Sequence, residues 1–194
     1  MKICLIRHGE TALQPEKRYQ GTTDAPLSPE GALRLIRTDP SIHKVYVTPL
    51  CRTRQTASIL FPEAEQIVIP DLREMDFGAF EGRNYLEMEH DEDYRAWVDG
   101  MCLGRCPGGE SKAEYCDRVC AAFAGLLDQA SGLEPVVIVA HGGTQMAVLE
   151  RFCRTKRDYW QWQLPSGHGY LLETDDWAKD RSLRVLETVD YTGE

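Results

Sequence analysis

Reactive side chains follow four apolar runs of this chain, at or within a few residues of the points where buried strands would end. In chain order they are Arg7 and His8, Arg52, Glu74 and Asp76, and His141. Arginine binds phosphate through paired hydrogen bonds, a neutral imidazole can attack phosphorus, and a second imidazole can donate a hydrogen bond to a developing oxyanion. A carboxylic acid can protonate the leaving oxygen if its pocket raises its pKa toward neutrality. Together these side chains predict phosphoryl transfer through a phosphohistidine, with no metal required.

The elements that must position these residues are short strands that alternate with helices. Apolar runs predict strands at 2–6, 44–47, 66–69 and 135–140, and a late hairpin of 169–174 and 183–189 with its turn between them. Helices are expected at 52–60, from the capping box Ser111–Glu114 through Leu127, and over Thr144–Phe152, with a further helix start at Ser28-Pro29. This alternation predicts an α/β fold, a three-layer αβα sandwich with a mostly parallel central sheet. Ligands of such sheets bind where the strands end at their carboxyl edge, so both histidines and both arginines should face one crevice.

A single domain is expected over residues 1–194, since no linker, repeat or low-complexity tract interrupts the pattern. Residues 83–98 are polar with spaced Tyr85, Tyr94 and Trp97, which suggests a helical, lid-like insertion around 83–110. These three aromatic residues could stack on a heterocycle or belong to the core.

The composition limits the partners of this chain. Its formal net charge of −9 disfavours nucleic acid and anionic membrane surfaces, and no apolar run approaches the length of a membrane span. The first apolar run ends at the charged Arg7 and is too short for the apolar core of a signal peptide. A cytoplasmic protein is therefore expected. The expected partner is a small phosphorylated metabolite, without a cofactor, and the oligomeric state stays open.

Seven cysteines are an odd number in a chain without an export signal, so reduced thiols are expected rather than disulfides. Two pairs, Cys102 with Cys106 and Cys116 with Cys120, could form a zinc site. The second pair lies in the predicted capped helix beside core positions, which favours small buried thiols. The acidic run 87–93 could bind a cation, but a solvated helix face is favoured. No metal is therefore expected.

Five sequence blocks occur together in this chain: "LIRHGET", "TPLCRTRQTA", "LREMDFGAFEG", "PGGES" and "VIVAHGG". In this order they resemble the histidine phosphatase superfamily, also called the phosphoglycerate mutase-like family, from residue 3 to about 170. By this resemblance His8 is the nucleophile that becomes phosphorylated, and Arg7, Arg52 and His141 bind the phosphoryl oxygens. The glycine pair that begins at Gly142 suggests a close backbone approach to the ligand.

The same resemblance implies further roles. Glu74 matches the family's proton donor, which later serves as base for the attacking water, and Asp76 is its rival. Gln14 stands where the family often has an asparagine in the phosphate pocket. The segment "YQGTTDAPLS" matches the family's substrate-edge loop, so Gln20 and Gly21 are further candidates for substrate binding.

This chain departs from the family pattern in three places. Thr48 stands where serine is commoner, and Gln14 is longer than the usual amide. The segment between Gly31 and Lys44 is short, which predicts a truncated first crossover helix. Arg52 is assigned rather than Arg54 because it follows Thr-Pro-Leu-x, so none of the departures removes a catalytic group.

Three functions are compatible with this set of residues. The first is a phosphatase that hydrolyses a small phosphomonoester, for which the blocks at 72–82, 91–100 and 106–111 resemble α-ribazole-5′-phosphate phosphatases of cobalamin assembly. The second is a mutase of the phosphoglycerate type, which needs extra cations and a closed lid that excludes water. The third is an inactive phospho-ligand binder, which is disfavoured because the catalytic set is intact. Hydrolysis is the preferred function.

Overall fold

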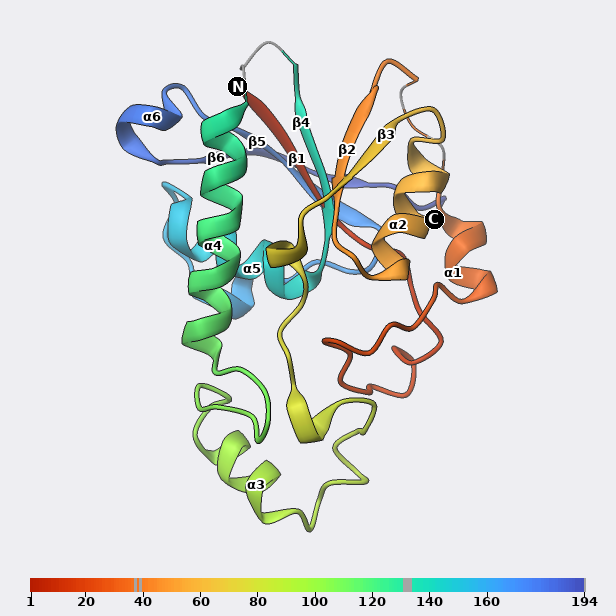
Figure 1. The fold of residues 1–194 in the computed structure, drawn as a ribbon, viewed down its shortest axis with the longest axis vertical. Helices are drawn as coiled ribbons and strands as arrows, with labels where there is room; N and C mark the ends of the chain where they lie inside the picture. Colours follow the sequence, from red (N-terminus) through yellow and green to blue (C-terminus); the bar gives the residue numbers. More distant parts are fainter. Residues whose placement is uncertain (37, 39, 131–133, 194) are drawn as a thin grey trace.

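The computed structural model of the protein describes residues 1–36, 38, 40–130 and 134–193. Within these ranges six strands form one sheet in the order β3-β2-β4-β1-β5-β6 (Figure 1). Their bounds are β1 Lys2–Arg7, β2 Lys44–Val47, β3 Glu65–Val68, β4 Val136–Ala140, β5 His168–Glu173 and β6 Arg184–Asp190. β1 to β4 pair in parallel with one another, while β5 and β6 form the antiparallel hairpin predicted late in the chain. The predicted α/β fold with a mostly parallel sheet is confirmed.

Helices lie on both faces of this sheet (Figure 1). The longer ones are α2 Cys51–Leu60, α3 Glu92–Asp99, α4 Lys112–Gln129 and α5 Gly142–Phe152, and the shorter ones are α1 Pro29–Arg34, α6 Trp177–Asp180 and the 3-10 turns η1 Pro70–Leu72, η2 Gly78–Phe80 and η3 Tyr159–Trp162. α1 has only six residues, in accord with the predicted truncation of the first crossover, although positions 37 and 39 lie outside the described residues. α6 occupies the segment that was predicted as a simple turn of the late hairpin.

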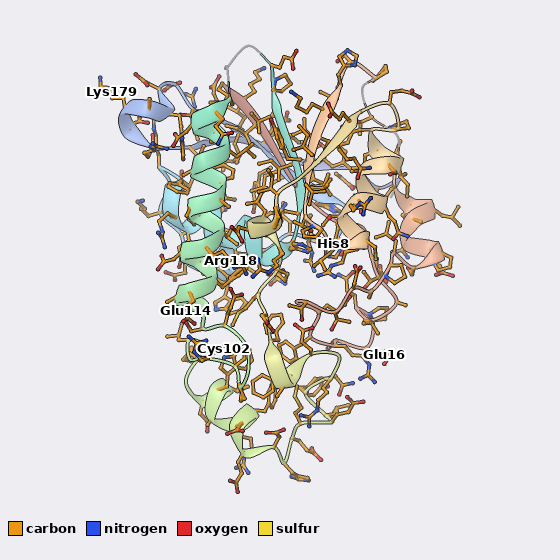
Figure 2. The ribbon with its side chains drawn as sticks, in the orientation of Figure 1. His8, Glu16, Cys102, Glu114, Arg118 and Lys179 are labelled. Carbon is orange, nitrogen blue, oxygen red and sulfur yellow. The ribbon has the colours of Figure 1, made fainter. Side chains whose placement is uncertain are left out.

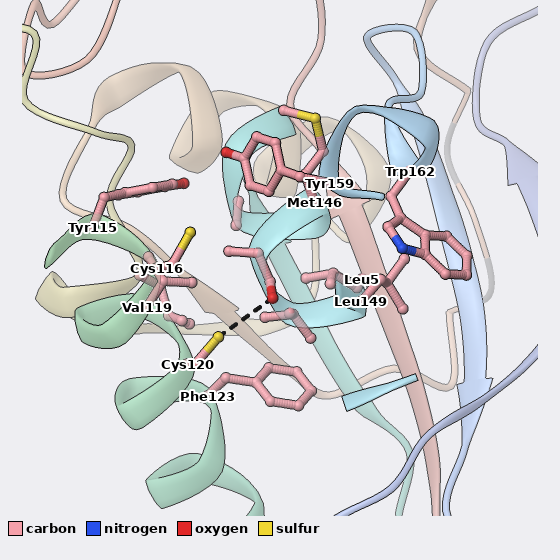
Figure 3. Close-up of a cluster of buried hydrophobic side chains, with 14 of the residues drawn as sticks. Leu5, Tyr115, Cys116, Val119, Cys120, Phe123, Met146, Leu149, Tyr159 and Trp162 are labelled. Carbon is pink, nitrogen blue, oxygen red and sulfur yellow. Dashed lines mark hydrogen bonds between the residues drawn. The ribbon is translucent and has the colours of Figure 1, made fainter. Parts of the chain in front are cut away.

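The alternation of side chains along the central strands builds two cores. In β1, Ile3 and Leu5 pack with the buried faces of α4 and α5, while Cys4 and Ile6 pack with α2 on the other face of the sheet. Figure 3 shows the first core, where Leu5 lies near Leu149 of α5 and the thiol of Cys120 donates to the carbonyl oxygen of Ala147 at 3.4 Å. Every residue of β4 is buried, as expected of a parallel strand that is covered on both faces.

Local signals set the starts of two helices as predicted. Ser28 caps α1 by accepting from the backbone N–H of Gly31 at 2.9 Å. Ser111 and Glu114 form the reciprocal capping box of α4, with the Glu114 carboxylate accepting from the backbone N–H of Ser111 at 2.9 Å. α5 begins at Gly142, two residues earlier than predicted, because His141 itself is its N-cap residue.

The insertion around 83–110 is helical only over α3, Glu92–Asp99. Before α3 the chain forms turns, in which the side-chain oxygen of Asn84 accepts from the backbone N–H groups of Leu86 and Glu87. The insertion is anchored by a cluster of aromatic rings whose centroids lie 5.1 to 6.4 Å apart, formed by Tyr19, Phe77, Phe80, Tyr94 and Trp97. Because Tyr19 belongs to the loop between β1 and α1, this cluster ties the insertion to the predicted substrate-edge loop.

None of the helices in the described ranges combines the length and the apolar composition that crossing a bilayer requires.

Candidate active site

His8 lies directly after β1, where the pairing with β4 ends. Its backbone N–H donates to the carbonyl oxygen of Ala140 at 3.0 Å, which extends the ladder by one residue. Its Nδ1 lies 2.7 Å from the carbonyl oxygen of Gly9, and because a carbonyl only accepts, Nδ1 carries the proton and Nε2 keeps its lone pair. Burial, reinforced by the charges of Arg52 and Arg7, holds the pKa of His8 well below its usual range. His8 is therefore a neutral imidazole with an unprotonated Nε2, placed beyond the strand ends (Figure 2).

His141 follows β4 and faces His8. The two ring centroids are 5.3 Å apart with an edge-to-face geometry. Its Nε2 lies 3.0 Å from the hydroxyl oxygen of Thr48, the residue that replaces the commoner serine. Burial, followed by the charge of Arg52, lowers the pKa of His141 well below its usual range. Thr48 therefore fixes the orientation of this ring from the end of β2.

The two predicted arginines reach the same place from different elements, the end of β1 and the first turn of α2. Arg7 donates from Nη1 to the carbonyl oxygen of Leu164 at 2.5 Å. Arg52 is fully buried and donates to the carbonyl oxygens of Gly21 and Thr23 at 3.0 and 2.8 Å. Burial lowers the pKa of both guanidinium groups, with Glu74 acting in the opposite direction, but an arginine keeps its charge in a protein. Two cations are thus held next to two neutral imidazoles.

Unpartnered polar atoms concentrate in this cage. Within the described residues, six buried side-chain nitrogen or oxygen atoms have no hydrogen-bond partner, and three of them are Arg7 Nε, Arg52 Nε and His141 Nδ1. The two guanidinium Nε atoms are donors, and a buried donor without a partner is costly, so an acceptor from outside the protein would satisfy them beside His8. A phosphoryl group, with three anionic oxygens, suits this arrangement. We call Arg7, His8, Arg52 and His141 the phosphate cage.

Glu74 reaches the cage across the N-terminus of α5. Its Oε2 accepts from the backbone N–H of Gly143 at 3.1 Å, and its Oε1 accepts from its neighbour Met75 at 3.0 Å. A Cβ at position 143 would lie 2.2 Å from Oε1, so only glycine lets the carboxylate approach this closely. The rival Asp76 instead caps a turn by accepting from the backbone N–H of Gly78 at 2.8 Å. The geometry thus separates the two carboxylates and favours Glu74 as the proton donor.

The remaining predicted residues surround the cage with their polar groups already engaged. Gln14 accepts from the backbone N–H of Thr11 at 2.8 Å and donates to the hydroxyl of Ser166 at 2.7 Å, and Gln20 accepts from the hydroxyl of Thr11 at 2.7 Å. Gly142 packs against Arg7, since a Cβ there would lie 3.3 Å from the guanidinium carbon. The structure brings Gln14 and Gln20 together through Thr11, as parts of the loop that follows His8.

An apolar cavity of about 270 Å³ opens beside Glu74. It is lined by Tyr19, Glu74, Met75, Phe77, Trp97, Cys102, Lys112, Gly143, Met146, Tyr159 and Trp160. We call it the aromatic cavity. Of the three insertion aromatics singled out from the sequence, Trp97 lines it, Tyr94 is buried in the anchoring cluster and Tyr85 is half exposed on the surface. If the phosphoryl group of a substrate were bound in the cage, its leaving group would therefore contact the aromatic rings of this cavity.

The cysteines are free thiols spread over the described part of the chain. Cys116 and Cys120 are buried along α4, and burial raises the pKa of both thiols, to about 11 and about 12. Among the described residues, no group of three or more histidine, cysteine or acidic side chains is arranged to hold a metal. In the acidic run, Asp91 caps α3 and Glu87 pairs with Arg18.

Sequence reasoning missed two supports of the site. Arg118 of α4 (Figure 2) donates to the carbonyl oxygens of Arg73 and Glu74 at 3.2 and 3.3 Å and pairs with Glu110 at 2.7 Å, so it holds the segment that carries the proton donor. Glu81 binds the substrate-edge loop through its carboxylate. Neither residue stands beside a strand end, and the only available signal was that both are charged residues in or near motif blocks.

Comparisons with known proteins identify relatives of this chain. The sequence model of the histidine phosphatase superfamily (branch 1) matches residues 3–184. The protein named "Probable phosphoglycerate mutase GpmB" from Salmonella choleraesuis (strain SC-B67) is 36% identical over 151 residues, which cover 73% of this chain and 70% of the relative.

Two solved structures extend the comparison over nearly the whole chain. A phosphoglycerate mutase from Thermus thermophilus is 32% identical, with a TM-score of 0.71 and coverage of 97% of this chain and 98% of that one. The α-ribazole phosphatase from Shigella flexneri is 24% identical and shares the fold, with a TM-score of 0.82 and coverage of 98% and 96%. The resemblance seen in the five sequence blocks is thereby confirmed, and the chain belongs to the histidine phosphatase superfamily, branch 1.

Proposed function

We propose that the protein is a phosphatase that hydrolyses a small phosphomonoester through a phosphohistidine on His8. The observation that carries this proposal is the phosphate cage, where three unpartnered nitrogen atoms surround an imidazole whose Nε2 is unprotonated. Nε2 attacks phosphorus and forms the N–P bond, while the bond from phosphorus to the leaving oxygen breaks and Glu74 gives its proton to that oxygen. Glu74 then takes a proton from water as the water oxygen forms a bond to phosphorus. The N–P bond breaks, its electron pair returns to Nε2 of His8, and inorganic phosphate leaves.

The aromatic cavity favours hydrolysis of a substrate with an apolar or aromatic leaving group. Its one lysine, Lys112, lies 3.7 Å from the carboxylate of Glu150 and 4.1 Å from the ring centroid of Tyr159, so it already has an anionic and an aromatic partner. A phosphoglycerate brings a carboxylate that would need further cations at this place. α-Ribazole 5′-phosphate, whose leaving group carries an aromatic base, is the first substrate to test, and this would place the enzyme in cobalamin assembly.

Mutase activity of the phosphoglycerate type is the second candidate. It is favoured by the names of the Salmonella relative and of the Thermus structure. Both reactions use the same phosphohistidine, and they differ in whether water or a second substrate oxygen receives the phosphoryl group.

The test is a product assay on purified protein with α-ribazole 5′-phosphate, 4-nitrophenyl phosphate and 3-phosphoglycerate. We expect inorganic phosphate from the first two, with kcat/KM highest for α-ribazole 5′-phosphate, and mass spectrometry after rapid quenching should place the phosphoryl group on His8. Conversion of 3-phosphoglycerate to 2-phosphoglycerate that outpaces phosphate release would establish the mutase instead. Phosphate binding without turnover of any substrate would identify an inactive binder.

We propose that the protein acts in the cytoplasm and that its substrate is a small phosphorylated metabolite. Seven free thiols suit a reducing compartment, and a net charge of −9 suits neither nucleic acid nor an anionic membrane.

A further inference from the structure

The carboxylate of Glu81 accepts hydrogen bonds from several backbone N–H groups of the substrate-edge loop. It accepts from the N–H groups of Gly21, Thr22 and Thr23 at 3.0, 2.9 and 3.1 Å, and from the Thr23 hydroxyl at 2.5 Å. Phe77, in the carboxylate's own segment, donates a further N–H at 3.0 Å. Successive N–H groups that converge on one anion form a nest, an anion-binding concavity of the backbone, and here the Glu81 carboxylate occupies it.

The opposite side of the same loop binds Arg52. Its Nη2 donates to the carbonyl oxygens of Gln20 and Gly21 at 3.2 and 3.0 Å, and its Nη1 donates to that of Thr23 at 2.8 Å. The peptide groups of one short loop thus point their N–H ends at Glu81 and their carbonyl ends at Arg52. This leaves Nε of the guanidinium unpartnered among the described residues, within the phosphate cage.

Gly21 makes this two-sided arrangement possible. A Cβ at this position would lie 1.6 Å from the carbonyl oxygen of Met75 and 2.4 Å from Oε1 of Glu81. The loop therefore lies directly against the segment that carries both Glu74 and Glu81.

We propose that Glu81 is a positioning residue for the reaction, which fixes the guanidinium of Arg52 through the loop 20–23 without touching the substrate. The inference rests on the proposed function in one respect, namely that Arg52 binds the phosphoryl group. Removing the carboxylate frees three N–H groups, lets the loop carbonyls turn away, and leaves Arg52 without the geometry that phosphate recognition requires.

Glu87 provides a matched control. It also joins the N-terminal loop to the insertion, through paired hydrogen bonds of 2.8 Å with Arg18. Its other hydrogen bond comes from the backbone N–H of Asn84, so the carboxylate binds outside residues 20–23. If the tie between loop and insertion were all that mattered, Glu87→Gln and Glu81→Gln would have similar effects.

The experiment measures kcat/KM with 4-nitrophenyl phosphate and the affinity for inorganic phosphate by calorimetry. The proteins are wild type, Glu81→Gln, Glu81→Asp, Glu87→Gln, Arg52→Lys and the double variant Glu81→Gln/Arg52→Lys. We expect Glu81→Gln to lower both quantities about 10- to 100-fold, with Glu81→Asp in between and Glu87→Gln near wild type. In the Arg52→Lys background the further loss from Glu81→Gln should shrink to about threefold or less, because both changes remove the same interaction.

Equal losses from Glu81→Gln in both backgrounds, or an equal loss from Glu87→Gln, would overturn the inference. So would unchanged phosphate affinity in a folded Glu81→Gln protein. If Glu81→Gln does not fold, Glu81→Asp and Thr23→Val replace it in the same cycle, with the same criteria. A failure of the proposed function looks different, since wild-type protein would then bind phosphate without turnover, and calorimetry would still report on Glu81.

Discussion

The phosphate cage and the aromatic cavity lie side by side but are built in different ways. The cage stands on the ends of β1 and β4 and on the first turn of α2, and its histidines and Arg52 are almost fully buried. The cavity is assembled from the insertion, the first turn of α4 and η3, and Trp160 on its wall is 56% exposed. In the proposed reaction, the cage presents fixed charge to the phosphoryl group that is common to every substrate, and the cavity presents replaceable rings to the part that differs.

This difference assigns the chemical step to the cage and the choice of substrate to the cavity. A change in the cage should alter the chemical step for every phosphomonoester alike. A change in the cavity should alter which phosphomonoester is preferred, and should leave the chemistry itself intact. The predictions below test this division, in order of decreasing effect.

Replacing His8 by alanine removes the attacking nitrogen. We expect His8→Ala to lower kcat by about four to six orders of magnitude for every substrate, because the phosphohistidine cannot form. Steady-state assays with aryl and alkyl phosphates measure this loss, and circular dichroism checks the fold. A loss that depended strongly on the leaving group would contradict the division between cage and cavity.

Glu74 lies between the cage and the cavity, so its substitution tests whether the chemical step depends on the leaving group. Glu74→Gln should lower kcat/KM about 100- to 1,000-fold for alkyl phosphates, whose leaving oxygen needs a proton, and much less for 4-nitrophenyl phosphate. The control is Asp76→Ala, which removes a turn cap and should lower the melting temperature without any dependence on leaving group. Equal losses for both substrate types would assign Glu74 a structural role.

Trp160 tests the cavity alone. Trp160→Ala should raise KM for α-ribazole 5′-phosphate about 3- to 10-fold, because a ring contact is lost, and should leave kcat/KM for glycerol phosphate nearly unchanged. Tyr85→Ala is the matched control, since Tyr85 is an exposed aromatic of the insertion outside the cavity. Equal effects of Trp160→Ala on both substrates would show that the cavity does not select.

The buried neutral histidines of the cage predict how stability depends on pH. The pKa values of His8 and His141 lie well below 6.5 in the folded protein, mainly through burial, so below pH 6.5 the unfolded chain binds protons that the folded chain does not. Stability from these groups is complete above about pH 6.5 and is lost as the pH falls toward their folded pKa values. Each kcal/mol lost should lower the melting temperature by about 2 to 4 °C.

Thermal unfolding followed by circular dichroism from pH 8 to pH 5 measures this trend. The control is His90→Gln, which replaces a surface imidazole that is 91% exposed and leaves the cage untouched. His141→Gln should flatten the curve, and an unchanged slope in that variant would argue against a buried neutral imidazole.

Metal removal should have no effect. The positive charge of the cage comes from Arg7 and Arg52, so dialysis against EDTA should leave kcat unchanged. Activity that is lost on dialysis and restored by zinc or magnesium would contradict this expectation.

The cage could be anticipated from the sequence because its parts follow strong local signals. The apolar runs of β1 and β4 are recognisable as parallel strands, and strand ends that share an edge bring His8 and His141 together. The N-cap of α1 at Ser28 and the capping box of α4 at Ser111 depend on neighbours a few residues away, so they too could be predicted.

The cavity and the support of Arg52 could not be anticipated, because they depend on contacts between distant segments. Glu81 binds N–H groups some 60 positions earlier in the chain, and backbone groups leave no signature in the side chains. The insertion was expected to be helical, but turns around Asn84 and a cluster of rings that includes Tyr19 set its shape instead. Tyr159 and Trp160 reach the cavity from η3, a segment without any apolar periodicity.

A Cβ atom at Gly143 or Gly21 would lie only 2.2 or 2.4 Å from a carboxylate oxygen. These two glycines therefore limit what protein engineering can change here. A single methyl group at position 143 would displace the carboxylate of Glu74, and one at position 21 would displace that of Glu81. A mutagenesis library aimed at new phosphomonoesters should therefore hold these two codons constant and randomise Met146 and Trp160, which line the cavity outside the cage and the anchoring cluster.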